Sequence, residues 1–313
     1  ISDAISADKV QQTISEFLVG KGFNEALNNS LTKGSYVEKL GGETLKTAHQ
    51  VEMLNPLSQD LNVMRQTLLF GLMENIQHNQ NRQHPDLKLF EFGKTYFNFS
   101  SGFNEQRNIA IALTGSKSEE SWNNSKESVS YFTLKGILAA LLERLGFAAN
   151  IQEKAFESDL FEDAQKFELF KKSIAELGVV NSKILKHFDV KNPVYFAVIN
   201  FDLLMETLKT VKIKFKELPK AFAIRRDFSL LVNKEVKFSE LEATAKKSEK
   251  QLLKSVNLFD VYEGDKLEAG KKSYALSFIL QDGDRTLTDQ EIDKAMERIR
   301  LAMEKENGAV LRS

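Results

Sequence analysis

The last hundred residues carry the pattern that most restricts the possible folds, an ordered series of strand-like and helix-like segments. Alternating apolar residues predict strands, and apolar residues at i, i+4 and i+7 predict helices. In chain order the segments are a strand at 227–232, a helix opened by Ser239, strands at 256–262 and 273–280, a helix opened by Thr288, and an edge strand at 310–311. The order β-α-β-β-α-β predicts a ferredoxin-like sheet with one face free of helices.

The ends of the two tail helices are also marked. Ser239 is followed three residues later by Glu242, and Thr288 by Glu291, which is the spacing of a capping box. Gly308 is expected to end the second helix, since glycine is the usual residue just past a helix C-terminus. One apolar stripe runs along that helix, formed by Ile292, Met296, Ile299 and Met303.

The rest of the chain predicts a second domain. A change of composition at 209–219 is interpreted as a linker, which divides the 313 residues into domains at 1–212 and 213–313. The stretch 116–130 is polar and predicts a surface loop, while 147–172 shows no clear pattern. Helices are expected at 6–19, 67–80, 133–146, 182–187 and from 202, and strands at 23–31, 51–54, 61–64, 87–97, 108–114, 173–180 and 194–201.

Composition excludes several classes of site. The chain has no cysteine, so disulfides, thiolate zinc sites and cysteine nucleophiles are excluded. Its four histidines lack an i+4 histidine partner, and no metal site is expected. No apolar run approaches the roughly 18 residues of a membrane span, and no signal pattern opens the chain. A cytoplasmic protein is expected, and the initial Ile indicates an excised fragment. A net charge of −1 permits RNA binding only through a local patch.

Three stretches resemble the β subunit of bacterial phenylalanyl-tRNA synthetases. Together they cover most of the chain in order, and residues 150–175 resemble the family least. The tail motifs are the most specific. The stretches read NPLSQDLNVMRQTLLFGLMENI with LKLFEFGKTYF, then YFTLKGILAALLERLG, then LPKAFAIRRDFSLLV, LFDVYEGDKLEAGKKSYALSFIL and RTLTDQEIDKAMERI.

The resemblance implies an α+β architecture. Residues 1–212 are expected to form a degenerate, catalytically inactive domain like that of class II aminoacyl-tRNA synthetases, built on an antiparallel sheet. Residues 213–313 are expected to form a ferredoxin-fold anticodon-binding domain. The implied function is the non-catalytic part of a phenylalanine–tRNA ligase. Its partners would be the catalytic α subunit, in an (αβ)₂ heterotetramer, and tRNA(Phe). ATP and Mg would bind in the α-subunit active site, and no cofactor is expected in this chain.

The residues that grip ATP in active class II synthetases are missing. In that family one arginine lies four residues after a strand glycine, and here Gly93 is followed at that distance by Phe97. A second arginine opens a glycine-rich helix, and Leu203 takes its place. Neither side chain can replace the planar fork with which Arg holds phosphate. No catalytic residue is therefore predicted, and the chain alone is expected to be inactive.

Anticodon recognition is predicted at Asp260, Tyr262 and Ser273. Asp260 and Tyr262 lie two apart on one strand, so their side chains share a face. A tyrosine ring can stack on a base, and a carboxylate can accept from the N1–H and N2–H groups of guanine. The family resemblance assigns the same role to Ser273. The alternative is a half-buried sheet tyrosine beside a surface carboxylate. Phe228 and Phe259 are expected to face the helices as core.

Basic residues near these strands are candidates for contacts with the tRNA backbone, although paired basic residues are often only solvated surface. Arg226 could instead pair with Asp227 or Asp260. The candidates are Arg225, Arg226, Lys271, Lys272 and Arg285.

Contact with the α subunit is predicted at Asn55, Pro56 and Arg65, by resemblance to the region through which class II folds pair. The alternative for Arg65 is a cap or ion pair within its own fold. Rival functions are an active enzyme, a regulatory paralogue built on a degenerate synthetase fold, and a free-standing RNA-binding module.

Overall fold

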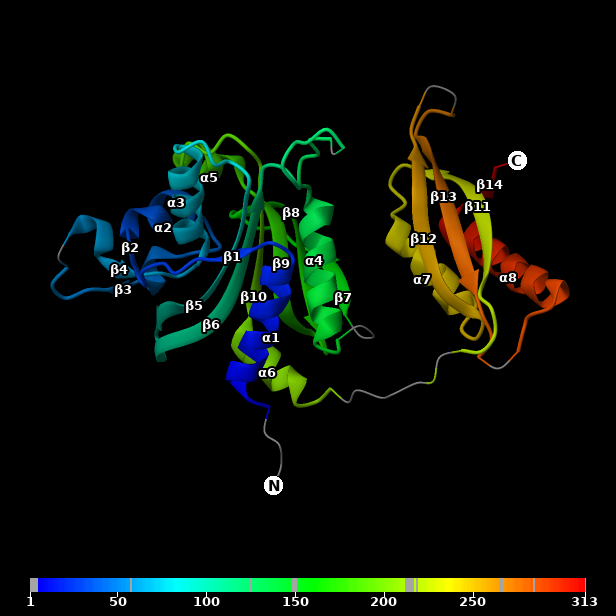
Figure 1. Cartoon of the computed structure of the whole chain (residues 1–313), viewed down its shortest axis with the longest axis horizontal. Coiled ribbons are helices and arrows are strands. Elements are labelled where there is room, and N and C mark those ends of the chain that lie inside the picture. The colour runs from blue at the N-terminus through cyan, green and yellow to red at the C-terminus, as the bar shows by residue number, and fades with distance from the viewer. Residues whose placement is uncertain are drawn as a thin grey trace. The chain divides into compact units, whose positions relative to one another are not determined.

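The computed structural model describes residues 5–56, 58–123, 125–147, 151–211, 217, 219–264, 267–283 and 285–312. The chain divides into two compact units, Ile1–Ile213 and Lys214–Ser313 (Figure 1). The first unit has two hydrophobic cores and the second has one.

A seven-stranded sheet organises the first unit, in the order β1-β5-β6-β10-β9-β8-β7. Only the short pair β1 and β5 is parallel, and the other neighbours are antiparallel. The antiparallel sheet expected for this part of the chain is confirmed. The strands are β1 (Asn24–Glu25), β5 (Leu87–Phe99), β6 (Gly102–Thr114), β7 (Gln152–Ala155), β8 (Phe161–Leu169), β9 (Lys172–Val180) and β10 (Val194–Asn200).

Helices pack against both faces of this sheet. In β6, Ile109 and Ile111 point into one core, whereas Ala110 and Ala112 between them point into the other. This alternation is the period of a strand. The first core is covered by α1 (Ala7–Gly20), α4 (Tyr131–Arg144) and α6 (Phe201–Leu208), and the second by α2 (Gly34–Leu40), α3 (Leu69–Gln80) and α5 (Ser182–His187).

The structure corrects the expected elements in two places. The three strands expected between 23 and 64 are short pieces, and the sequence analysis missed α2, whose seven residues are too few to show helical periodicity. It also missed β7 and β8, because two irregularities in the register of β8 against β9 break the alternation. A second, three-stranded sheet consists of β2 (Leu31–Thr32), β4 (Val63–Met64) and β3 (Val51–Glu52), with single 3₁₀ turns at η1 (Thr47–His49) and η2 (Gln59–Leu61).

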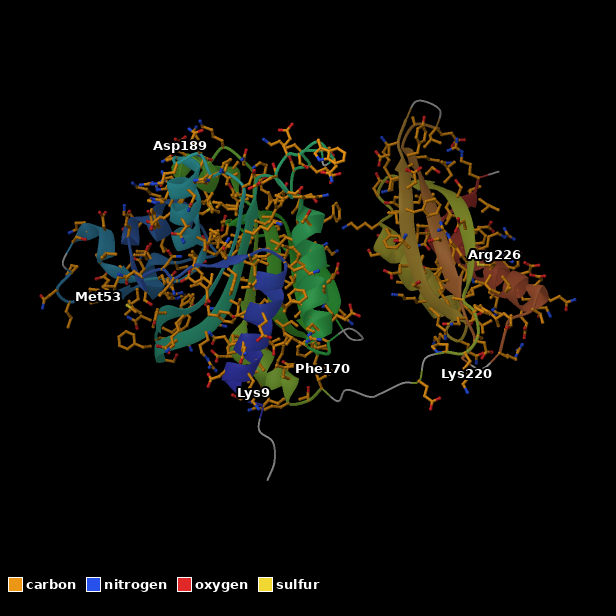
Figure 2. The ribbon with its side chains drawn as sticks, in the orientation of Figure 1. Lys9, Met53, Phe170, Asp189, Lys220 and Arg226 are labelled. Carbon is orange, nitrogen blue, oxygen red and sulfur yellow. The ribbon has the colours of Figure 1, made fainter. Side chains whose placement is uncertain are left out.

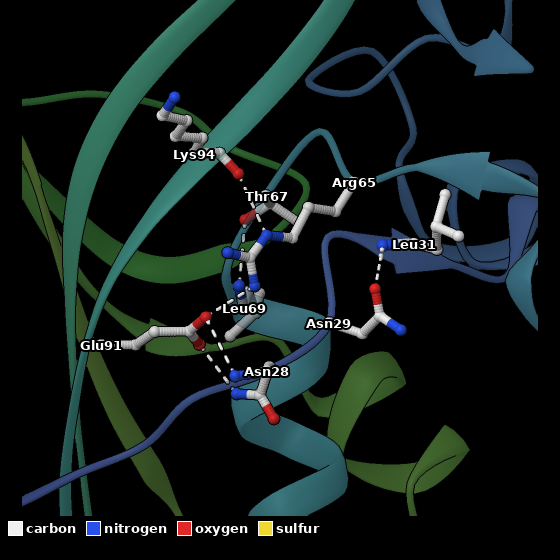
Figure 3. Close-up of polar contacts among 8 residues, drawn as sticks. All are labelled: Asn28, Asn29, Leu31, Arg65, Thr67, Leu69, Glu91 and Lys94. Atoms are coloured by element: carbon white, nitrogen blue, oxygen red, sulfur yellow. Dashed lines mark hydrogen bonds and ion pairs between the residues drawn. The ribbon is translucent and has the colours of Figure 1, made fainter.

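A buried ion pair ties the small sheet to the large one (Figure 3). Arg65, directly after β4, donates through Nη1 to Glu91 Oε1 at 2.6 Å and through Nε to the Lys94 carbonyl at 3.0 Å. Asn28 donates through Nδ2 to the other oxygen of Glu91 at 2.7 Å. A Cβ atom on Gly93 would collide with the guanidinium, so a larger residue at this position in β5 would displace the Arg65 side chain.

This geometry bears on the two alternatives for Arg65. Its side chain is 7% exposed and that of Glu91 is 0% exposed. The guanidinium forms an ion pair within its own fold, as the second alternative has it, and contact of Arg65 with the α subunit stays a prediction.

Glu91→Gln should strongly destabilise the first unit, since it leaves the Arg65 charge buried without its counter-ion. We expect a loss of about 3 kcal/mol in the free energy of unfolding, measured by urea denaturation. Glu105→Gln is the matched control, because Glu105 pairs with Lys94 in the same sheet but both side chains are about half exposed. Its expected loss is below about 1 kcal/mol. Equal losses for the two variants would contradict the assignment.

The second unit has the predicted ferredoxin-like topology. Its elements are β11 (Ile224–Asn233), α7 (Phe238–Ser248), β12 (Leu253–Tyr262), β13 (Lys271–Leu280), α8 (Asp289–Asn307) and β14 (Val310–Leu311), and the strand order is β12-β13-β11-β14. Leu230 and Leu276 on the strands pack with Leu241 of α7 and Ile299 of α8 in one core. Both helices therefore cover the same face of the sheet.

The helix ends agree with the sequence at α8 but not at α7. Glu291 accepts from the Thr288 N–H at 3.0 Å, which confirms the capping box, and Gly308 ends the helix at φ +62°. The helix α7 begins before Ser239, at Phe238. Glu242 is consequently one turn inside the helix, where it pairs with Lys246 and cannot close the predicted box.

Candidate nucleic-acid interface

The helix-free face of the second unit brings the predicted anticodon residues together. In the antiparallel register Tyr262 is opposite Ser273, and Asp260 is opposite Ala275. Residues opposite one another share a face. The intervening Tyr274 points the other way, into the core beneath the helices. Asp260, Tyr262 and Ser273 therefore all lie on the free face.

Small side chains form the surface beside the Tyr262 ring. Ser229 on β11 is opposite Ala275 on β13, so Ser273 is its diagonal neighbour on the same face, with the two Oγ atoms 3.4 Å apart. The ring itself packs over Gly264, where a Cβ atom would come within 2.6 Å of the tyrosine hydroxyl. Tyr262 is 37% exposed, whereas Ser273 is buried among its neighbours. The Tyr262 ring thus packs on Gly264 at one side and is exposed to solvent at another.

Arg312 also belongs to this surface, although it was not among the residues predicted from the sequence. Its N–H donates to the Ser229 carbonyl at 2.7 Å, continuing the edge strand β14 by one residue. Its guanidinium carbon lies 5.9 Å from the centre of the Tyr262 ring. A cation at this distance is attracted to the ring face. The available signal was an arginine directly after the predicted edge strand at 310–311.

Phe259 is the position where the predicted orientation was wrong. The register of β12 shifts between Leu258 and Asp260, so Phe259 is an extra residue without a partner on β13. Its side chain is 50% exposed, and the Arg225 guanidinium lies 5.1 Å from its ring centre. Phe228, by contrast, packs against Phe278 in the core as expected, with ring centres 5.2 Å apart.

Two of the basic candidates lie on the free face, and each already has an acidic partner. Arg225 holds Asp227 in a two-bond ion pair, with Nε–Oδ1 at 2.8 Å and Nη2–Oδ2 at 3.0 Å. Hydrogen bonding to that carboxylate raises the pKa of Arg225. Lys271 pairs with Glu268 at 2.7 Å and thereby lowers the pKa of Glu268.

The other three candidates do not reach the face of Tyr262. Lys272 is buried on the helix side with its ammonium 4.7 Å from the Tyr274 ring centre. Arg226, opposite Phe278 on the same side, pairs with Asp289 at 3.7 Å, not with Asp227 or Asp260. Arg285 makes two bonds to Glu291, and together with the Thr288 cap they lower the pKa of Glu291 to about 2.

The first unit contains the remaining predicted positions. Asn55 and Pro56 are exposed in the loop after β3, next to Leu54, which is 98% exposed. Met53 of this loop lies at the left edge of the first unit in Figure 2. Phe97 stacks on Phe99 with ring centres 5.6 Å apart. Leu203, in the first turn of α6, packs against the first core.

The described residues form neither a cluster of metal ligands nor a membrane-spanning helix. No three His, Cys, Asp or Glu side chains among them gather in a way that could hold a metal ion. None of the helices they form combines the length and the apolar character needed to cross a membrane.

Comparison with known proteins identifies the class of each unit. Residues 219–312 match the family described as "Ferredoxin-fold anticodon binding domain". The first unit resembles a solved pyrrolysyl-tRNA synthetase from Desulfitobacterium hafniense, with a TM-score of 0.53 at 13% identity over 66% of this chain and 70% of that one. This likeness shows the fold alone. The protein thus joins a class II synthetase-like domain to a ferredoxin-fold anticodon-binding domain.

Sequence similarity then defines the family. Residues 3–201 match "Phenylalanyl tRNA synthetase beta chain CLM domain". The phenylalanine–tRNA ligase β subunit of Bacteroides thetaiotaomicron is 44% identical over 98% of this chain, and that of Geobacillus kaustophilus is 32% identical over 96%. The chain belongs to the phenylalanyl-tRNA synthetase β-chain family. It spans 38% and 37% of the length of these two curated relatives.

Two tyrosines on opposite faces of the sheet in the second unit should respond differently to truncation. Tyr274→Ala removes a core ring and should cost about 3 kcal/mol of unfolding free energy. Tyr262→Ala removes a partly exposed ring and should cost less than about 1 kcal/mol. Denaturant unfolding of the two variants tests this. A loss at Tyr262 as large as that at Tyr274 would mean that Tyr262 serves the core.

Proposed function

We propose that this chain is a non-catalytic part of a phenylalanine–tRNA ligase that supports the catalytic α subunit and recognises the anticodon of tRNA(Phe). Family membership supports the proposal. The observation that carries it is the grouping of Asp260, Tyr262 and Ser273 on a sheet face without helices. Such a face can present an aromatic ring to an unstacked base.

The chemistry of this face fits a guanine, the first base of phenylalanine anticodons. The Tyr262 ring offers a stacking surface, and the Asp260 carboxylate can accept from the N1–H and N2–H donors of that base. Asp260 is exposed, and the structure gives it no ion pair among the described residues. The hydroxyls of Ser229 and Ser273 add donors and acceptors beneath the base. Arg312 adds a cation that can stack on the base or hold a neighbouring phosphate.

Backbone contacts are assigned to Arg225 and Lys271, the two basic candidates on the free face. A tRNA phosphate would have to displace Asp227 or Glu268 from them. Arg226, Lys272 and Arg285 contribute less, because each is already engaged away from this face.

The first unit is proposed to contact the α subunit in a cytoplasmic (αβ)₂ heterotetramer. Leu54, which directly precedes the predicted Asn55 and Pro56, is an exposed apolar residue, and so is Phe103 on β6. Exposed apolar patches are frequent at protein interfaces. ATP and Mg would be bound by the α subunit, since Phe97 and Leu203 stand where phosphate-binding arginines are needed.

Tyr262→Ala should weaken binding of tRNA(Phe) by about 1–3 kcal/mol, the usual contribution of a base–aromatic stack. The measurement is a binding titration of the chain assembled with its α subunit, at fixed salt. Phe170→Ala is the control, since Phe170 is an exposed aromatic residue at a turn of the first unit. If Tyr262→Ala binds the tRNA as tightly as the parent does, Tyr262 does not recognise the anticodon.

The purified chain alone should show no ATP–pyrophosphate exchange with phenylalanine. The expected reason is the missing pair of arginines, without which the charge that develops on the phosphates is not stabilised. Exchange above background that is retained through repeated purification would overturn the non-catalytic assignment.

A further inference from the structure

A cavity of about 220 Å³ opens on the large sheet of the first unit, on the face that carries α3. Its floor comes from β5, β6, β9 and β10, and its rim from residues 44–45, 66–68 and 160–161. An apolar cavity of about 150 Å³ in another protein is large enough for benzene. This cavity can therefore hold one aromatic ring with a short side chain.

The charge of the lining restricts what can bind. Glu176 supplies a carboxylate, and none of the described residues that line the cavity is Lys, Arg or His. Among the lining residues an anion would find no counter-ion, whereas a cation would find the Glu176 carboxylate, which the Lys166 ammonium approaches from elsewhere at 3.6 Å. Three aromatic rings, Phe97, Phe161 and Phe196, provide apolar walls.

Two buried polar atoms on the lining residues have no hydrogen-bond partner among the described residues. They are Oε1 of Gln66 and Oγ of Ser173. Gln66 is 4% exposed and is held in place by its Nε2, which donates to the Lys46 carbonyl at 3.0 Å. Buried polar groups usually have hydrogen-bond partners, so these two atoms can accept from a polar group that enters the cavity. An ammonium group has three donors and no acceptor, which suits acceptors of this kind.

The environment of Glu176 also favours a cation. Burial raises the pKa of this carboxyl, and the nearby Lys166 ammonium, 3.6 Å away, only partly opposes that effect. A positive group inside the cavity would stabilise the ionised form from the buried side.

The rim of the cavity is already ordered in the structure. Asp159 accepts from the Glu43 N–H at 2.7 Å and also binds Thr44, which joins the two loops that border the opening. Gly42 permits this approach, since it has φ +55° and a Cβ atom there would collide with the Asp159 side chain. The rim residues Thr44, Leu45 and Leu160 are thereby fixed.

We propose that this cavity binds a small organic cation in which a primary ammonium is joined to one aromatic or apolar group. The ammonium would lie near Glu176, and the apolar group against the phenylalanine rings. This binding is separate from the anticodon face and does not depend on the proposed function.

The probe is 2-phenylethylammonium, titrated into the 313-residue chain and followed by calorimetry. We expect saturable binding with a Kd on the order of 1 mM or tighter. Glu176→Gln keeps the shape of the side chain but removes its charge, and should weaken binding about tenfold or more. Glu105→Gln, which removes a paired carboxylate of the same sheet outside the cavity, should leave the Kd unchanged.

The anion 3-phenylpropanoate separates charge recognition from simple burial of the ring. It has a similar apolar body, and we expect no saturable binding. The proposal is overturned if the two compounds bind equally, if Glu176→Gln leaves the Kd of the ammonium unchanged, or if the parent shows no saturable binding of the ammonium. Thermal unfolding of Glu176→Gln verifies that the variant is folded.

Discussion

The buried contact between Arg65 and Glu91 is the interaction on which the interior of the first unit depends. It connects the segment after β4, the strand β5 of the large sheet and the stretch around Asn28, which are distant in sequence. A charge taken out of water is tolerated only with a counter-charge and further hydrogen bonds, and here both are present. The Arg65 guanidinium beside Gly93 is already bonded to Glu91 and to the Lys94 carbonyl. Arg65 therefore presents no unpaired positive charge on this face of the sheet.

The two units differ in the charge of the groups that they expose to a ligand. The open face of the second unit carries Arg225, Lys271 and Arg312 around an aromatic ring, a combination suited to a polyanion with exposed bases. The cavity of the first unit is lined by a carboxylate, amides and aromatic rings, which suits a cation. Although the net charge of the chain is only −1, basic groups thus gather on the open face of the second unit and a carboxylate lines the cavity of the first.

Much of the second unit could be predicted because its signals are local. The Thr288–Glu291 cap, the stop at Gly308 and the order of the elements along the chain all follow from residues close together in sequence. The elements that escaped prediction depend on contacts distant in sequence or on irregular pairing. The helix α2 is too short for a periodic signal, and β8 is irregular at two points. Arg312 reaches Tyr262 only because β14 and β12 are placed on either side of β11 and β13.

The extra residue at Phe259 determines on which face of the sheet Asp260 and Tyr262 lie. Upstream of it Val256 and Leu258 face the helices, so an uninterrupted alternation would turn Asp260 inward too. Tyr262 would then be opposite Lys272, on the covered side of the sheet. One additional residue exchanges inside for outside over the rest of the strand. The side chain at 259 therefore matters less than the presence of a residue there, since one residue more or fewer in the strand determines on which face of the sheet Asp260 and Tyr262 lie.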